Sequence, residues 1–124
     1  MSWPSLVRAY IAGITAEFGT RASIATPPNL HELEGFIRVT KGPGSDDKIY
    51  DSSLVDFDVF AQTYDKAEKD AEALRAWVLT TQNRKLGGVI IGQVQTATSP
   101  VWVDWGNPNV HRFVYSARVV TKRT

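Results

Sequence analysis

The stretch LVDFDVFAQTYDKAEKDAEALRAWV, residues 54–78, constrains the fold more than any other part of the chain. Its first eight residues alternate in a way that buries Val55, Phe57, Val59 and Ala61 on one face, which predicts a half-buried strand. A helical stripe follows it, made of Ala67, Ala71, Leu74 and Val78. This stripe predicts a helix capped by Thr63 or Asp65, with Asp65 and Glu68 resembling a capping box.

The remaining elements follow from the same two periodicities. Residues 3–18 predict a first amphipathic helix, and Gly87–Gly88 is expected to end the second. Further strands are predicted at Ser23–Ala25, Phe36–Thr40, Val89–Thr98, Val101–Trp105 and His111–Thr121. The order contains no strand–helix–strand repeat of a parallel sheet. We therefore expect one α+β domain over residues 1–124, with an antiparallel (mixed) sheet and both helices packed on one face.

The same periodicities predict which side chains form the core. The expected core residues are Tyr10, Ile14, Val55, Phe57, Val59, Leu74, Val78, Phe113 and Tyr115. By contrast, Lys41–Ser53 separates two strands with thirteen residues rich in Gly, Ser and Asp. Hairpin connections normally take about two to five residues, so this stretch is predicted to be a long polar loop.

Composition excludes several classes of protein. With 43% apolar and 22% charged residues, the chain is typical of a globular domain, and without cysteine it forms neither disulfides nor thiolate zinc sites. The N-terminal MSWPSLVRAYIAGITAEF lacks the pattern of a signal peptide. No run approaches the roughly 18 apolar residues that span a bilayer. We expect the chain to fold in a cytoplasm and to bind no membrane.

Charge is divided unevenly along the chain, although the net charge is only +1. Residues 44–72 hold nine acids and three bases, whereas the rest hold eleven bases and four acids. Such a division suits self-association better than nucleic-acid binding, although two scattered solvated faces would give the same counts.

Candidate catalytic residues are few. Asp56 and Asp58 lie on one strand face, as in a metal-dependent nuclease, but a nuclease needs a further acid nearby, so the polar face of a strand is the better interpretation. His31 and His111 have unrelated contexts and no metal-ligand spacing. Trp102 and Trp105 are expected to pack at a turn rather than stack on bases. We predict no enzyme activity, no cofactor and no metal.

The order of motifs along the chain carries a family resemblance. VRAYIAGI is followed by a connector with Thr26 and Pro28, by FIRVTKGPG, by the strand and helix of DSSLVDFDVFAQTYDKAEKDAEALRAWV, and by WGNPNVHRFVYSARVVTKR. This pattern resembles the tail terminator (tail completion) proteins of long-tailed bacteriophages, especially those of actinobacterial phages. The resemblance covers nearly the whole chain and includes no catalytic motif.

The resemblance implies a structural virion protein. Such a protein assembles in the host cytoplasm and forms a homo-hexameric ring on the head-proximal end of the tail tube. The ring stops polymerisation of the major tail tube protein and docks the head-completion or connector protein, while DNA passes through its lumen without being read. Another head–tail connector or minor tail subunit of similar fold is the alternative. A small metal-dependent nuclease using Asp56 and Asp58 is a second, less favoured alternative.

This resemblance gives the long loop a role, because a loop of such length is costly unless it contacts something. We expect Lys41–Ser53 and the basic C-terminal strand to contact neighbouring subunits or the tube, with opposite charges attracting head to tail. The predicted interface residues are Lys41, Asp46, Asp47, Lys48, Ile49, Tyr50, Asp51, Arg112, Arg118, Lys122 and Arg123.

Overall fold

The computed structural model describes residues 5–46 and 50–122. The elements in chain order are α1 (Ser5–Phe18), β1 (Arg21–Ser23), the 3-10 helix η1 (Leu30–Glu32), β2 (Gly35–Asp46), β3 (Tyr50–Ala61), α2 (Tyr64–Thr80), β4 (Lys85–Leu86), β5 (Val89–Val103) and β6 (His111–Lys122). The described strands form one sheet in the order β1-β2-β3-β6-β5-β4. Neighbouring strands are antiparallel, except for β1 and β2, which are parallel.

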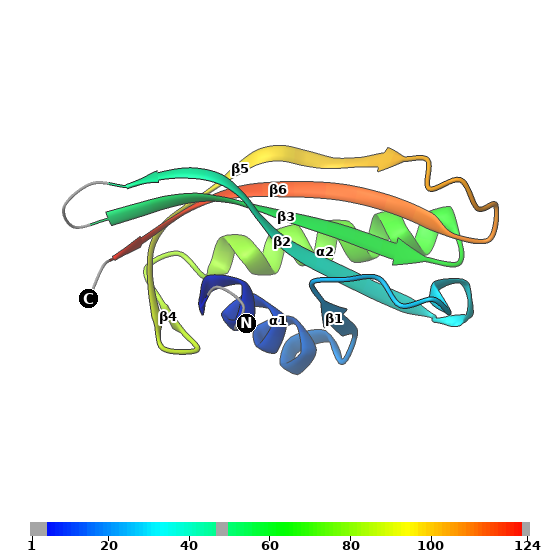
Figure 1. Cartoon of the computed structure of the whole chain (residues 1–124), viewed down its shortest axis with the longest axis horizontal. Coiled ribbons are helices and arrows are strands. Elements are labelled where there is room, and N and C mark those ends of the chain that lie inside the picture. The colour runs from blue at the N-terminus through cyan, green and yellow to red at the C-terminus, as the bar shows by residue number, and fades with distance from the viewer. Residues whose placement is uncertain (1–4, 47–49, 123–124) are drawn as a thin grey trace.

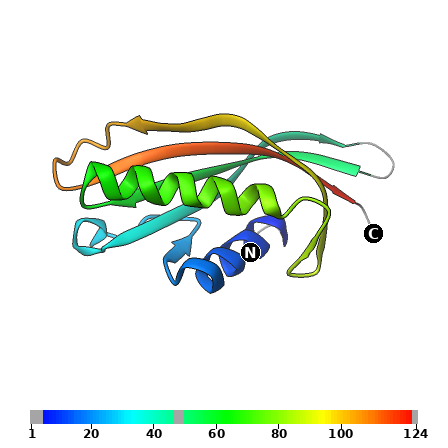
Figure 2. The same ribbon diagram turned by 180° about the vertical axis from the view of Figure 1, so that it is seen from behind.

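Both helices pack on one face of this sheet (Figures 1 and 2). A single buried cluster joins α1 and α2 to the inward side chains of β2, β3, β5 and β6, and it contains every residue that the sequence predicted for the core. Tyr10 and Phe57 meet edge to face there, with ring centroids 5.6 Å apart. The predicted α+β class, with a mixed sheet and two helices on one face, is confirmed.

The second helix begins where expected but ends earlier. Thr63 is its N-cap, and the Thr63 hydroxyl accepts a hydrogen bond from the backbone amide of Lys66, so the capping box predicted at Asp65 is wrong. Thr81 ends the helix. Gly87 and Gly88, predicted as its end, instead form the two-residue turn between β4 and β5. Both have positive φ, as such tight hairpin turns require.

The predicted long loop is wrong, because most of it is strand. β2 continues to Asp46 and β3 starts at Tyr50, with Gly44, Ser45 and Asp46 paired to Ser53, Ser52 and Asp51. A register shift between Lys41 and Gly44 marks a bulge that the sequence did not reveal. Ser52 and Ser53, which lowered the strand propensity of this segment, are tolerated in β3 because β3 also pairs with β6 along its whole length.

The strands near the ends of the sheet also differ from prediction. The two strands expected on either side of Pro100 are one strand, β5, with register shifts near Thr98. β4 pairs only with Val89 and Ile90, so the part of β5 that contains Pro100 is an edge of the sheet. Proline is compatible with an edge strand. β1 begins at Arg21 rather than Ser23, and the strand β4 was not predicted.

The outer face of the sheet, opposite the helices, is covered at one end only. There a second cluster of buried residues brings η1 and the β5–β6 connection down onto the sheet. Its members are Leu30, Phe36, Phe60 and Val110, with Leu33 and Trp105 packed against them. This cluster lies at the opposite end of the sheet from the β2–β3 hairpin tip and the last residues of β6 (Figure 1).

Candidate interface surfaces

The two carboxylates considered for catalysis are both engaged in contacts on the outer sheet face. The Arg38 guanidinium binds Asp58 through two nitrogens, at 2.8 Å and 2.7 Å from the same carboxylate oxygen. The Ser116 hydroxyl donates to Asp56 at 2.5 Å. Within residues 5–46 and 50–122, no group of three or more His, Asp or Glu side chains could hold a metal ion. This geometry is that of an ion pair and hydrogen bonds that hold strands together, and it offers no free acid–base pair.

Arg112, one of the predicted interface residues, holds the β5–β6 connection in place. Its guanidinium carbon lies 5.0 Å from the centre of the Trp105 ring, and that of Arg38 lies 5.7 Å from the same ring. Trp105 also meets Phe60 edge to face at 4.9 Å. Two cations on one indole fix this connection against the sheet. Packing of Trp105 at a turn, as the sequence predicted, is confirmed. The same prediction is wrong for Trp102, which lies within β5 and is substantially exposed.

Other predicted interface residues gather around the β2–β3 hairpin. Lys41 is exposed on β2, and the backbones of Asp46 and Asp51 pair with each other. Asp47, Lys48 and Ile49 lie outside the described residues, as does Arg123.

The basic residues at the end of β6 lie next to this hairpin within the same chain. Lys122 pairs with Tyr50, and an Arg118 nitrogen is 3.4 Å from the Ser52 hydroxyl. Arg112 lies near the other end of the strand, opposite Phe60. Strand pairing therefore brings Arg118 and Lys122 to the same end of the sheet as Asp46 and Asp51 of the same chain. The interface role of these residues stays a prediction.

An aromatic group that the sequence did not reveal lies at the start of α2. The Tyr64 ring is 5.1 Å from Phe113, 6.2 Å from His111 and 6.4 Å from Trp102, measured between ring centroids. The Trp102 indole nitrogen donates to His111 at 3.4 Å. Tyr64 and Trp102 nevertheless remain 44% and 41% exposed. Only tertiary pairing brings these residues together, because they come from three separate elements.

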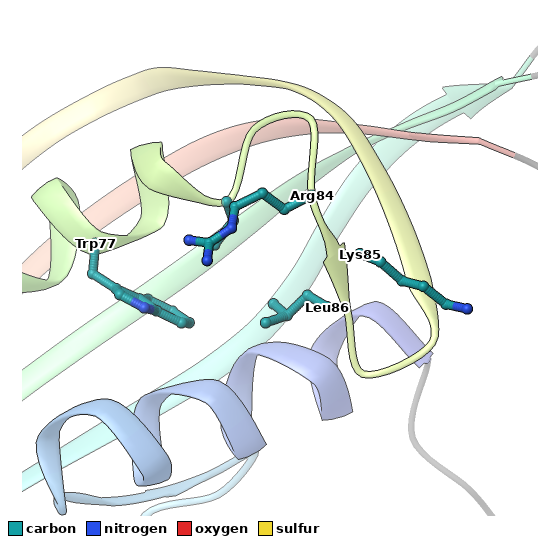
Figure 3. A pocket seen from close by; sticks show the side chains of 5 residues that line it. Trp77, Arg84, Lys85 and Leu86 are labelled. Carbon is teal, nitrogen blue, oxygen red and sulfur yellow. The ribbon is translucent and has the colours of Figure 1, made fainter.

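A small cavity lies beneath the turn that follows α2 (Figure 3). It measures about 120 Å³ and is lined by Trp77, Thr81, Arg84, Lys85 and Leu86. Trp77 and Leu86 point toward one another above α1, whereas Lys85 points away (Figure 3). Arg84 reaches back to the Thr80 carbonyl at 3.5 Å, where a cation complements the end of the helix.

The perturbed titratable groups belong to the core rather than to these surfaces. Burial raises the pKa of Tyr10 to about 12, and the hydrogen bond that its hydroxyl shares with Thr81 partly offsets this rise. Burial also raises the pKa of Tyr115, against the opposing effect of the nearby Thr96 hydroxyl. Both tyrosines stay neutral near pH 7, and both side chains are fully buried in the core.

Across residues 5–46 and 50–122, each helix is too short or too polar to cross a membrane. No protein-family model and no curated protein matches the chain. Solved structures with the same fold do match it. A chain from the virion of a native gene transfer agent (GTA) particle has 16% identity and a TM-score of 0.62, and the match covers 98% of this chain and 100% of that one. A second solved chain has 14% identity and a TM-score of 0.56, covering 97% and 92%.

Proposed function

We propose that this chain is a structural protein of a phage-like virion and that it forms a ring which caps the head-proximal end of the tail tube. The observation that carries the proposal is the fold likeness to the gene transfer agent virion chain, which runs over nearly all of both chains. The motif order resembling tail terminator proteins is an independent argument from the sequence.

The chemistry of the surfaces supports a structural role. Asp56 and Asp58 are held by Ser116 and Arg38, so neither carboxylate is free to bind a catalytic metal. The chain instead carries exposed apolar side chains, including Ile24, Leu79, Val101 and Trp102. Contiguous exposed apolar groups, such as the rings of Tyr64 and Trp102, are typical of surfaces that contact other proteins. In the proposed assembly the partners are further copies of the chain, the major tail tube protein and a head-completion protein.

The test is in vitro tail assembly. Purified tube protein should polymerise to tubes of uncontrolled length, and addition of this chain should stop growth at a defined length and leave a ring visible by electron microscopy at one tube end. Filled heads should then join the capped tubes. A protein that binds heads but leaves tube growth unchanged would instead be a head–tail connector of the same fold. A protein that binds neither tubes nor heads would contradict the proposal.

A further inference from the structure

The β4 strand and the start of β5 form a two-stranded ribbon, which we call the β4 ribbon (residues 85–90), with two different faces. Lys85 is paired with Ile90 and Leu86 with Val89. Directly paired residues share a face, so Leu86 and Val89 pack together against the core, as observed, and Lys85 and Ile90 face outward. Ile90 is 39% exposed, and Lys85 forms no ion pair or hydrogen bond with the described residues.

The start of α2 carries an exposed aromatic and acidic surface, which we call the acidic aromatic patch (Tyr64, Asp65, Glu68 and Trp102). Of the two lysines in the same turns, Lys66 is paired with Asp70, and Lys69 is exposed. Its two rings lie 6.4 Å apart and are both substantially exposed. Glu68 follows Tyr64 by four residues, so the two side chains share one side of the helix. Asp65 and Glu68 are exposed and have no ion-pair partner within residues 5–46 and 50–122.

These two surfaces lie at opposite ends of the molecule. Figures 1 and 2 show the β4 ribbon beside the end of α2, whereas the start of α2 lies beside the β5–β6 connection at the other end. Complementary patches at opposite ends form a heterologous contact, which closes into a ring when the rotation per subunit allows it. An ammonium group on aromatic faces beside a carboxylate is also a favourable pairing.

We propose that the β4 ribbon of one copy of this chain docks on the acidic aromatic patch of the next copy, with Lys85 against the rings of Tyr64 and Trp102 and close to Glu68. Ile90 then covers the exposed edge of the aromatic pair. The occupant is a second copy because the charges and the apolar groups of the two patches match one another. This inference rests on the ring in the proposed function and names the surfaces that join it.

The contact is made by side chains rather than by strand addition. Beyond the β4 pairing, the open edge of β5 contains Pro100 and two irregularities of register near Thr98. Proline and bulges on an edge strand prevent another strand from pairing with it. Trp102, the member of the acidic aromatic patch that lies on β5 two residues after Pro100, therefore remains available for a side-chain contact.

The experiment measures self-association of the full chain by sedimentation velocity at low and high salt. Lys85→Glu and Glu68→Lys should each weaken association roughly tenfold at low salt, and the difference should shrink at high salt because exposed charges are screened. A 1:1 mixture of the two variants should recover ring formation, since each then meets an opposite charge. The chain carrying both substitutions should recover it as well.

Glu17→Lys is the matched control, because it reverses an exposed charge on α1, an element that carries neither patch. It should associate as the wild type does. Trp102→Ala should weaken association without any change of charge. If both patch variants form rings as well as the wild type does, or if the Glu17→Lys control weakens association as much as they do, the assigned surfaces are wrong. The proposed function would still stand. A wild-type chain that stays monomeric even on tail tubes would overturn both.

Discussion

The hydroxyl groups of Tyr10 and Thr81 lie 2.9 Å apart and join α1 to the residue that ends α2. The Thr81 hydroxyl donates its single proton to the Val78 carbonyl at 2.6 Å, so the Tyr10 hydroxyl is the donor in the bond between them. One hydrogen bond between two residues that are 71 positions apart in sequence thus links the two helices. The Thr81 backbone amide also donates to the Val78 carbonyl and caps the end of α2.

Tyr10→Phe should lower the free energy of unfolding by roughly 0.5–1.5 kcal/mol, because it removes one buried hydrogen bond and no ring contact. Thr81→Val should lower the free energy of unfolding by more. It removes the hydrogen bond from the Thr81 hydroxyl to the end of α2, and it leaves the buried Tyr10 hydroxyl without a partner. Urea unfolding of the two variants beside the wild type measures the difference. Equal stability of Tyr10→Phe and Thr81→Val would contradict the assigned donor.

Stability should fall between pH 10 and pH 12. The pKa of Tyr10 is raised by burial from 10.0 to about 12, so the unfolded chain loses this proton first. The stabilisation is therefore complete below pH 10 and is lost as the pH rises toward 12, at up to about 1.4 kcal/mol per pH unit for one group. The stability of the Tyr10→Phe variant should fall less steeply over this pH range. The raised pKa of Tyr115 should account for part of the fall that remains. If the free energy of unfolding depends on pH in the same way for the wild type and for Tyr10→Phe, Tyr10 does not contribute to the pH dependence.

Leu74→Ala should destabilise the protein by roughly 2–5 kcal/mol, because Leu74 is fully buried between α2 and the sheet. Leu79→Ala is the matched control on the same helix, since Leu79 is 39% exposed, and it should cost far less. Thermal unfolding followed by circular dichroism compares the two. If the Leu74 variant melts at the wild-type temperature, the placement of this helix face in the core is wrong.

Local periodicity was sufficient to predict the core and both helices. Val55, Phe57 and Val59 alternate on one strand, and the Ala-rich stripe of α2 has an unbroken helical spacing, so each pattern identifies its own buried face. The order of elements then excluded a parallel α/β sheet. These features depend on neighbours in sequence, which is why sequence analysis could find them.

The errors share another cause, which is that long-range pairing overrode local propensity. β3 pairs with β6 through Asp51, Ser52 and Ser53, which extends β3 beyond its predicted start. β5 also pairs with β6, and this pairing continues β5 beyond Pro100. The acidic aromatic patch could not be predicted for the same reason, since Tyr64 and Trp102 meet only after β5 and β6 have paired. No local signal marked β4, which has only two residues.

Asp58→Asn should lower stability by roughly 1–3 kcal/mol and should remove no catalytic activity. Asp58 is 7% exposed and its carboxylate accepts two bonds from Arg38, so neutralising it leaves a half-buried guanidinium without its counter-charge. Asp56→Asn, whose partner is the neutral Ser116 hydroxyl, should cost less. Metal-dependent DNA cleavage by the pure wild-type chain that disappears in the double variant would instead support the nuclease alternative.

The outer part of the β2–β3 hairpin should be dispensable for folding but required for assembly. Its ladder from Gly35 to Lys41 pairs with Val55 to Ala61 and contributes Ile37, Val39 and their partners on β3 to the main core, so the pairs that anchor the hairpin to the fold lie before the bulge. Replacing residues 44–53 with a two-residue Asn-Gly turn should therefore leave a folded protein with modestly lower stability, because β6 loses only its last partners on β3.

The shortened protein should fail to limit tube growth or fail to permit head joining, because we predict that the hairpin contacts a neighbouring subunit or the tube. Asp46→Asn with Asp51→Asn keeps the full length and removes only charge, so it separates an electrostatic contact from a steric one. Circular dichroism and tube lengths measured by electron microscopy check both variants. A shortened protein that still caps tubes of normal length, which then join heads, would show that the hairpin has no role in assembly.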